Sequence, residues 1–170
     1  MVMKRFFFRG VVVSCLLFIV QNAQALKVGE QAPACPMRES KGEGASIDLN
    51  KFRGKVVYLD YWASWCGPCL ESMPFMDQLS KELSAKGLEV VPVNVDEVPE
   101  DASAFLKAHP ISMAVVSDST GECPSKYDVQ VMPSSFLIDK KGVIRHVHKG
   151  FHSGDKSEIR SLVEKLLSEP

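Results

Sequence analysis

Two cysteines separated by two residues, in the stretch Trp65-Cys66-Gly67-Pro68-Cys69, have a spacing suited to redox chemistry. Their sulfurs come within bonding distance when the first lies at a helix start and the second one turn inside it, with Pro68 in the opening turn. The positive end of the helix dipole favours a thiolate and lowers the pKa of Cys66. The pattern therefore predicts thiol-disulfide exchange, in which Cys66 attacks a partner and Cys69 resolves the mixed disulfide.

Other uses of the pair are less favoured. A purely structural disulfide would close too short a loop to remove much entropy from the unfolded chain. A zinc site would need a second pair of ligands, whereas Cys35 and Cys123 stand alone in the sequence. His146 and His148 point to one side of a predicted strand, but without further ligands at suitable spacing we interpret that strand as solvated. We expect no metal and no other cofactor.

A β-prone run leads into the cysteine pair and a helix follows it. Residues 55–62 read Lys-Val-Val-Tyr-Leu-Asp-Tyr-Trp, which is typical of a central strand covered on both faces. Beyond the pair, apolar residues recur at helical spacing until Gly87, and Pro74 is expected to kink this helix.

The rest of the chain alternates between strands and helices. We expect strands over 88–95, 113–116, 135–138 and 143–148, and helices over 99–109, 122–127 and about 156–167. The order predicts an α/β domain with a central mixed sheet flanked by helices on both faces. Before it, a β-hairpin extension is expected around Lys41-Gly42-Glu43-Gly44.

Residues 1–25 are expected to be a secretory signal peptide, because three basic residues precede the apolar run Val11–Val20 and Ala23 and Ala25 form an Ala-x-Ala cleavage pattern. An uncleaved membrane tether is the alternative, since the run is short but not impossible for one. We expect a single domain over 26–170, exported to the periplasm or another extracytoplasmic space and soluble after cleavage.

The composition agrees with an ordinary soluble domain. Hydrophobic residues make up 45% of the chain and charged residues 24%, and the formal net charge is −1. Loss of residues 1–25, which carry three positive charges and no negative one, shifts it to −4. No basic patch is interleaved with aromatic residues, which argues against nucleic-acid binding. We expect a monomer.

These motifs resemble the thioredoxin superfamily. The stretch Trp65 to Cys69 is identical to the thioredoxin active-site motif, and four others resemble the exported TlpA-, ResA- and DsbE-like branch: Val28-Gly29-Glu30-Gln31-Ala32-Pro33, Phe52-Arg53-Gly54-Lys55, Glu71-Ser72-Met73-Pro74 and Tyr127-Asp128-Val129 through Phe136-Leu137-Ile138-Asp139. The resemblance implies a thioredoxin fold and a thiol-disulfide oxidoreductase acting on protein disulfides. The Gly-Pro dipeptide favours a reductant, supplied with electrons by a membrane partner, in cytochrome c maturation or a similar process.

The resemblance also assigns residues outside the motif. Pro133 matches the cis-proline that faces the cysteine pair, so Met132, Pro133 and Trp65 are expected to contact substrate. Asp60 interrupts an apolar strand where cytosolic thioredoxins keep a buried Asp. Burial should raise its pKa and let it take the proton of Cys69, although a hydrogen-bonded core carboxylate with no kinetic role is the alternative.

Two further positions concern acidic residues near the site. ResA-like proteins keep a glutamate shortly after the second cysteine, and Ser72 stands there in this chain. Glu97, at a strand end, is a candidate acidic modulator of the site or a solvated charge.

Cys35 and Cys123 can bond to each other, remain thiols or act as a relay. We predict a structural disulfide between them. It would attach the N-terminal segment to the body and close a long loop, which is worth about 4 kcal/mol in the chain-entropy model.

Two other functions remain as alternatives. A thiol peroxidase sets its reactive cysteine in a Pro-x-x-x-Thr-x-x-Cys context, and residues 58–66 have neither that Pro nor that Thr. A copper-binding assembly factor would want a wider cysteine spacing and a histidine within residues 130–134, where this chain has none. Both patterns are weaker matches than that of an oxidoreductase.

Overall fold

The computed structural model describes residues 28–35, 37–39 and 46–170. The expected signal peptide and the turn at residues 41–44 lie outside these residues. Among the helices that are described, none is both long enough and apolar enough to cross a bilayer.

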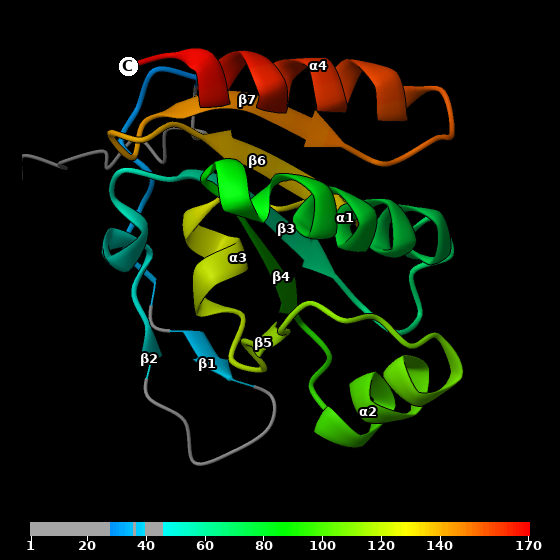
Figure 1. Cartoon of the computed structure of the whole chain (residues 1–170). Helices are drawn as coiled ribbons and strands as arrows, with labels where there is room; N and C mark the ends of the chain where they lie inside the picture. Colours follow the sequence, from blue (N-terminus) through cyan, green and yellow to red (C-terminus); the bar gives the residue numbers. More distant parts are fainter. Residues whose placement is uncertain (1–27, 36, 40–45) are drawn as a thin grey trace, which may run out of the picture.

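A mixed sheet lies at the centre of the described part (Figure 1). Its seven strands are β1 (Met37–Glu39), β2 (Ser46–Ile47), β3 (Val56–Trp62), β4 (Leu88–Asn94), β5 (Val116–Ser117), β6 (Ser134–Ile138) and β7 (Ile144–Lys149), in the order β2-β1-β5-β4-β3-β6-β7. β3 pairs in parallel with β4 and antiparallel with β6, which pairs antiparallel with β7. All seven residues of β3 are buried. A strand covered on both faces needs apolar side chains on both, which explains the nearly continuous apolar run.

Four α-helices flank the sheet: α1 (Cys69–Leu83), α2 (Pro99–Ala108), α3 (Glu122–Lys126) and α4 (Asp155–Ser168). Two short 3-10 turns, η1 (Leu49–Phe52) and η2 (Ser84–Lys86), lie before β3 and after α1. The predicted α/β class, with helices on both faces of a mixed sheet, is confirmed.

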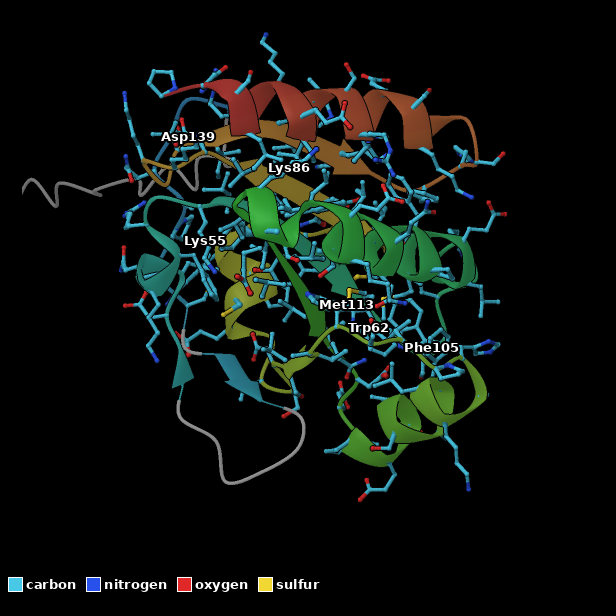
Figure 2. The ribbon with its side chains drawn as sticks, viewed as in Figure 1. Lys55, Trp62, Lys86, Phe105, Met113 and Asp139 are labelled. Atoms are coloured by element: carbon cyan, nitrogen blue, oxygen red, sulfur yellow. A yellow bond between two sulfur atoms is a disulfide. The ribbon has the colours of Figure 1, made fainter. Side chains whose placement is uncertain are left out.

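Successive residues of β3 point to opposite faces and form two cores. Tyr58 and Trp62 pack with α1 and α4, and Trp62 meets Phe105 of α2 with ring centroids 5.1 Å apart (Figure 2). On the other face, Tyr61 packs against Tyr127 at the end of α3, with centroids 5.6 Å apart. The cysteine pair belongs to the first core.

Two expectations for the strands need correction. The strand expected over 113–116 is only β5, which begins at Val116. Residues 112 and 113 are drawn to α1 instead, because their backbone N–H groups donate to the Asp77 carboxylate at 2.8 and 3.0 Å. β7 is also not solvated throughout: His146 and His148 lie half-buried beside α4.

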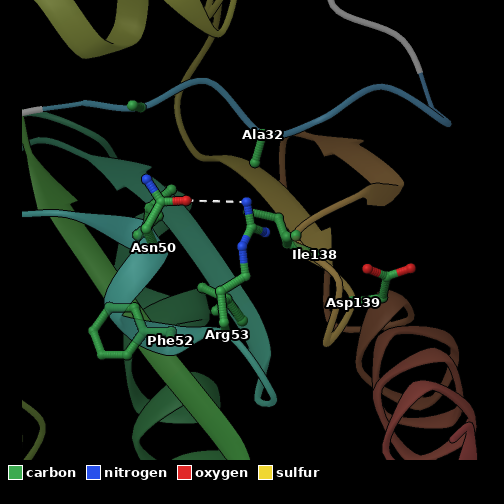
Figure 3. A pocket seen from close by; sticks show the side chains of 10 residues that line it. Ala32, Asn50, Phe52, Arg53, Ile138 and Asp139 are labelled. Carbon is green, nitrogen blue, oxygen red and sulfur yellow. Dashed lines mark hydrogen bonds between the residues drawn. The ribbon is translucent and has the colours of Figure 1, made fainter.

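The N-terminal hairpin is confirmed, because β1 pairs antiparallel with β2 and joins the main sheet through β5. Arg53 connects the segment before the hairpin to the body: its guanidinium donates to Gln31 Oε1 at 3.4 Å, to Lys141 O at 2.7 Å and to Asn50 Oδ1 at 3.0 Å (Figure 3). The pocket around Arg53 has a free volume of about 20 Å³, enough for one water molecule. This pocket is therefore a small gap between packed segments and is too small for a substrate.

Candidate active site

A tight turn connects β3 to α1 and carries the cysteine pair. Cys66 N–H donates to Ala63 O at 3.1 Å, and Cys69 N–H donates to Cys66 O at 3.2 Å. The helix begins at Cys69 with Pro68 as its N-cap. Cys69 is thus the first helical residue and does not lie one turn inside the helix as predicted, because residues 66–68 form the turn themselves. Cys66 stands just before the positive end of α1.

The two cysteines form a disulfide, with an S–S distance of 2.03 Å and Cα atoms 5.4 Å apart. Cys69 is fully buried, Cys66 retains 4% exposure, and Trp65 beside them is 71% exposed. An incoming thiol or disulfide therefore meets Cys66 first, and Cys69 is reached only through Cys66. This asymmetry matches the predicted roles of attacking and resolving cysteine.

Asp96, a buried carboxylate that was not predicted from the sequence as a site residue, stabilises the turn. Its oxygens accept hydrogen bonds from the backbone N–H and the hydroxyl of Ser64, at 3.0 to 3.2 Å, and from Asn94 Nδ2 at 2.8 Å. Asp96 thereby ties the end of β4 to the start of the active-site turn. The neighbouring Glu97, chosen from the sequence, is exposed. An Asn-x-Asp pattern at a strand end, typical of local side-chain to backbone bonding, was the available signal.

Asp60 lies on the same face of β3 as Tyr58 and Trp62, toward the core that contains the disulfide. It is fully buried, and its Oδ1 accepts a hydrogen bond from Ser135 Oγ at 2.5 Å. Its Oδ2 has no hydrogen bond from the described residues. Burial raises the pKa of Asp60 from 3.8 to about 7, and the Ser135 hydrogen bond offsets part of that shift. The carboxyl can therefore exchange a proton near neutral pH.

The loop that leads into β6 contains the cis peptide bond predicted from the sequence, between Met132 and Pro133. Met132 packs against the core that contains both active-site cysteines, and Pro133 is buried. Pro133 O accepts a hydrogen bond from Gly150 N at 2.8 Å, which anchors the loop to the end of β7.

Exposed apolar side chains cluster in the segments around the disulfide. Trp65 and Leu70 lie in and after the motif, and Val131 precedes the cis bond. A surface pocket of about 220 Å³, between α1 and α2, is lined by Leu70, Phe105 and Ile111 among others. A protein segment bound at Cys66 would meet apolar surface on this side.

Cys35 and Cys123 lie in the second core, on the opposite face of the sheet from the active-site pair. Both are buried, and in this structure their sulfurs are not joined. A hydrogen bond between the two thiols lowers the pKa of Cys35. The predicted disulfide remains a prediction, and the two side chains are already in contact.

Comparisons with known proteins agree with this geometry. A family model described as Redoxin matches residues 27–164. The thiol-disulfide oxidoreductase ResA of Bacillus thuringiensis subsp. konkukian is 33% identical over 143 residues, which cover 84% of this chain and 80% of that protein. The ResA of Bacillus subtilis is 30% identical over 145 residues, covering 82% and 80%.

Among solved structures, a putative thiol:disulfide interchange protein DsbE from Chlorobium tepidum superposes with a TM-score of 0.79 at 39% identity, covering 84% of this chain and 99% of that one. The fold, the disulfide at the end of β3 and the similarity along most of the chain lead to one assignment. The chain belongs to the Redoxin family, as a ResA- and DsbE-like thiol-disulfide oxidoreductase of the thioredoxin superfamily.

Proposed function

We propose that this oxidoreductase works outside the cytoplasm as a reductant of disulfides in other proteins, with apocytochrome c or a similar exported protein as substrate. The observation that carries the proposal is the one-sided access to the Cys66–Cys69 disulfide: only Cys66 reaches the surface. The signal pattern in residues 1–25 supports export. The Gly-Pro dipeptide between the cysteines, shared with reducing thioredoxins, supports the direction.

The reaction would proceed in two exchanges. The Cys66 thiolate attacks one sulfur of the partner disulfide, so that a Cys66–partner bond forms, the partner S–S bond breaks and one partner thiolate leaves. The Cys69 thiolate then attacks Cys66 Sγ, which forms the Cys66–Cys69 bond and releases the second partner thiolate. The partner gains two electrons and this protein loses them. A dithiol protein in the membrane would restore the reduced pair.

Asp60 would act as the base in the second exchange. Cys69 is fully buried, so its proton needs an acceptor inside the core. Asp60 faces that core with one oxygen not hydrogen-bonded by any described residue, and its pKa of about 7 suits proton exchange at neutral pH. Glu97 is exposed, so a modulating role for it would be electrostatic and weak.

The rest of the site would receive the partner. Trp65, next to Cys66 and exposed, and Met132, which packs against the core of the disulfide, would offer apolar contacts, and the loop around Pro133 would hold the partner backbone. We propose that the protein acts as a monomer, with this apolar surface left open to protein partners.

We also propose that Cys35 and Cys123 form a structural disulfide after export. Tyr127 Oη already donates to Pro33 O at 3.0 Å and Lys126 Nζ to Ala34 O at 3.4 Å, so the N-terminal segment lies against α3. An oxidised bond would make this attachment covalent.

Activity distinguishes the candidate functions. With dithiothreitol as electron source, the protein is expected to accelerate the reduction of insulin disulfides, and Cys66→Ser to abolish the acceleration because the attacking sulfur is lost. Peroxide consumption and Cu(I) titration are measured on the same samples. Turnover of peroxide alone, or copper binding without insulin reduction, would contradict the proposal.

Replacing Asp60 with Asn should raise the free energy of unfolding, and more at about pH 8 than at about pH 5. Between 3.8 and about 7, the folded carboxyl keeps a proton that the unfolded chain releases, so stability declines as pH rises through this window. The full decline is at most about 4 kcal/mol. Urea unfolding of the oxidised proteins at both pH values measures it.

Asp77→Asn serves as the control, because its expected change in the free energy of unfolding has the opposite sign. Despite its desolvation, hydrogen bonds from Lys81, Ser112 and Met113 lower the pKa of Asp77 to about 2. Its stabilisation is present above pH 3.8 and fades as pH falls toward 2, so this variant should lose stability at neutral pH. A pH-independent effect of Asp60→Asn would show that Asp60 is ionised in the folded protein at every pH tested.

Thiol counting tests the second disulfide. The exported Cys66→Ser/Cys69→Ser double variant, denatured without reductant, should contain no titratable thiol because Cys35 and Cys123 are oxidised. The same sample after reduction should contain two, which serves as the positive control. Two thiols before reduction would rule out the disulfide.

A further inference from the structure

A row of polar side chains crosses the sheet from Asp60 to its edge. Asp60 of β3 lies opposite Ser135 of β6, and Ser135 lies opposite His148 of β7. Residues directly opposite each other in antiparallel pairs project to the same face with Cβ atoms about 4.5–5.5 Å apart. The three side chains therefore form one line across three strands, beneath α4.

Hydrogen bonds connect both ends of this row. Ser135 Oγ donates to Asp60 Oδ1 at 2.5 Å and lies 3.4 Å from Tyr58 Oη. At the outer end, His148 Nε2 lies 3.0 Å from Asp155 Oδ2 at the start of α4. The link from Ser135 to His148 rests on the strand register alone.

Exposure increases along the row. Asp60 and Ser135 are 0% and 3% exposed, whereas the side chains of His148 and Asp155 are 20% and 24% exposed. The row thus leads from the centre of the core to partly exposed side chains at the β7 edge of the sheet.

The proposed role of Asp60 requires such a path, because the carboxyl would gain and lose a proton in every catalytic cycle. Asp60 and Cys69 are fully buried and Cys66 nearly so, so neither the carboxyl nor the resolving sulfur is in direct contact with solvent. A buried base that cannot release its proton to solvent would stay protonated and could act only once.

We propose that Ser135, His148 and Asp155 form the path by which protons pass between Asp60 and solvent. This inference rests on the proposed role of Asp60 as the base. Ser135, His148 and Asp155 are positioning residues, since they act on the reacting sulfurs only through Asp60.

The orientation of the hydrogen bonds in the oxidised protein suits inward transfer. When a donor thiolate attacks Cys66, the Cys66–Cys69 bond breaks and Cys69 leaves as a thiolate, which takes a proton from Asp60 Oδ2. Ser135 passes its proton to Asp60 Oδ1 and takes one from a ring N–H of His148, and solvent supplies a proton to His148 in return. In the opposite half of the cycle, the Ser135 hydroxyl rotates and the same transfers run outward.

Other titratable groups lie close to the row. Burial, with the charges of Asp60 and Asp155, raises the pKa of Tyr58, so its hydroxyl stays protonated. His146, next to His148 on the same face, has its pKa lowered by burial and then by the charge of His148, while Glu158 of α4 opposes that shift. The backbone N–H of His152 donates to Asp155 Oδ2 at 2.7 Å.

The test follows the resolving step directly. Reduced protein is mixed with a bis(nitrobenzoate) disulfide, which releases one coloured thiolate when Cys66 attacks and a second when Cys69 resolves. A pH-indicator dye in weakly buffered solution follows the proton. His148→Gln should slow the second release at pH 7 by on the order of tenfold, a fraction of the 10²–10⁴ that a general base supplies. Proton release should slow to the same extent, because Asp60 has to pass its proton outward before it can accept the proton of Cys69.

Matched variants separate this path from a structural effect. Asp155→Asn should slow both signals in the same way, and Ser135→Thr, which keeps the hydroxyl, should retain the native rate where Ser135→Ala does not. His146→Gln removes a histidine from the same face of β7 outside the row and should leave both signals unchanged.

Two results would overturn the inference, and they are distinguishable. If Asp60→Asn slows the second release while His148→Gln and Asp155→Asn behave as the native protein, the proton leaves through the mouth of the active site and the row carries none. If Asp60→Asn itself leaves the second release unchanged, Asp60 is not the base, and the proposed function loses that step.

Discussion

The structure depends on β3 being hydrogen-bonded along both edges and buried on both faces. Its neighbours β4 and β6 fix its position, and two separate cores pack on its alternating side chains. Because the active-site turn begins directly after Trp62, the location of Cys66 is set by the sheet and not by a mobile loop. The buried Asp96 reinforces this by holding Ser64. A fixed position lets one sulfur meet the partner while the other stays covered.

The same burial that fixes the turn gives Asp60 its chemistry. A carboxyl in the interior of β3 loses its hydration, and one hydrogen bond from Ser135 replaces only part of it. Its proton affinity therefore matches neutral pH, at a cost in stability that grows as the carboxyl ionises. In the proposed mechanism, an ionisable group inside the strand that leads into the disulfide couples proton transfer to electron transfer. The polar row toward β7 is the route to solvent that we propose for this carboxyl.

Much of this arrangement was predictable from the sequence because it is local. The run over residues 55–62, the cysteine spacing and the Met-Pro pair each determine a feature through nearby residues. What was missed depends on contacts between distant segments. Asp96 becomes important only when β4 lies beside β3, and Ser135 and His148 form a row only through the strand register. The β5 boundary shifted because Asp77 on α1 takes the N–H groups of residues 112 and 113.

In the proposed mechanism Cys66 attacks and Cys69 resolves, and trapping of mixed disulfides distinguishes these two roles most directly. Cys69→Ala and Cys66→Ala variants are each exposed to protein disulfides, and the adducts are located by mass spectrometry under non-reducing conditions. Cys69→Ala should accumulate a mixed disulfide at Cys66, while Cys66→Ala should form almost none, because Cys69 is fully buried. Equal trapping on both variants would contradict these roles, since it would mean that partners reach Cys69 without first reacting with Cys66.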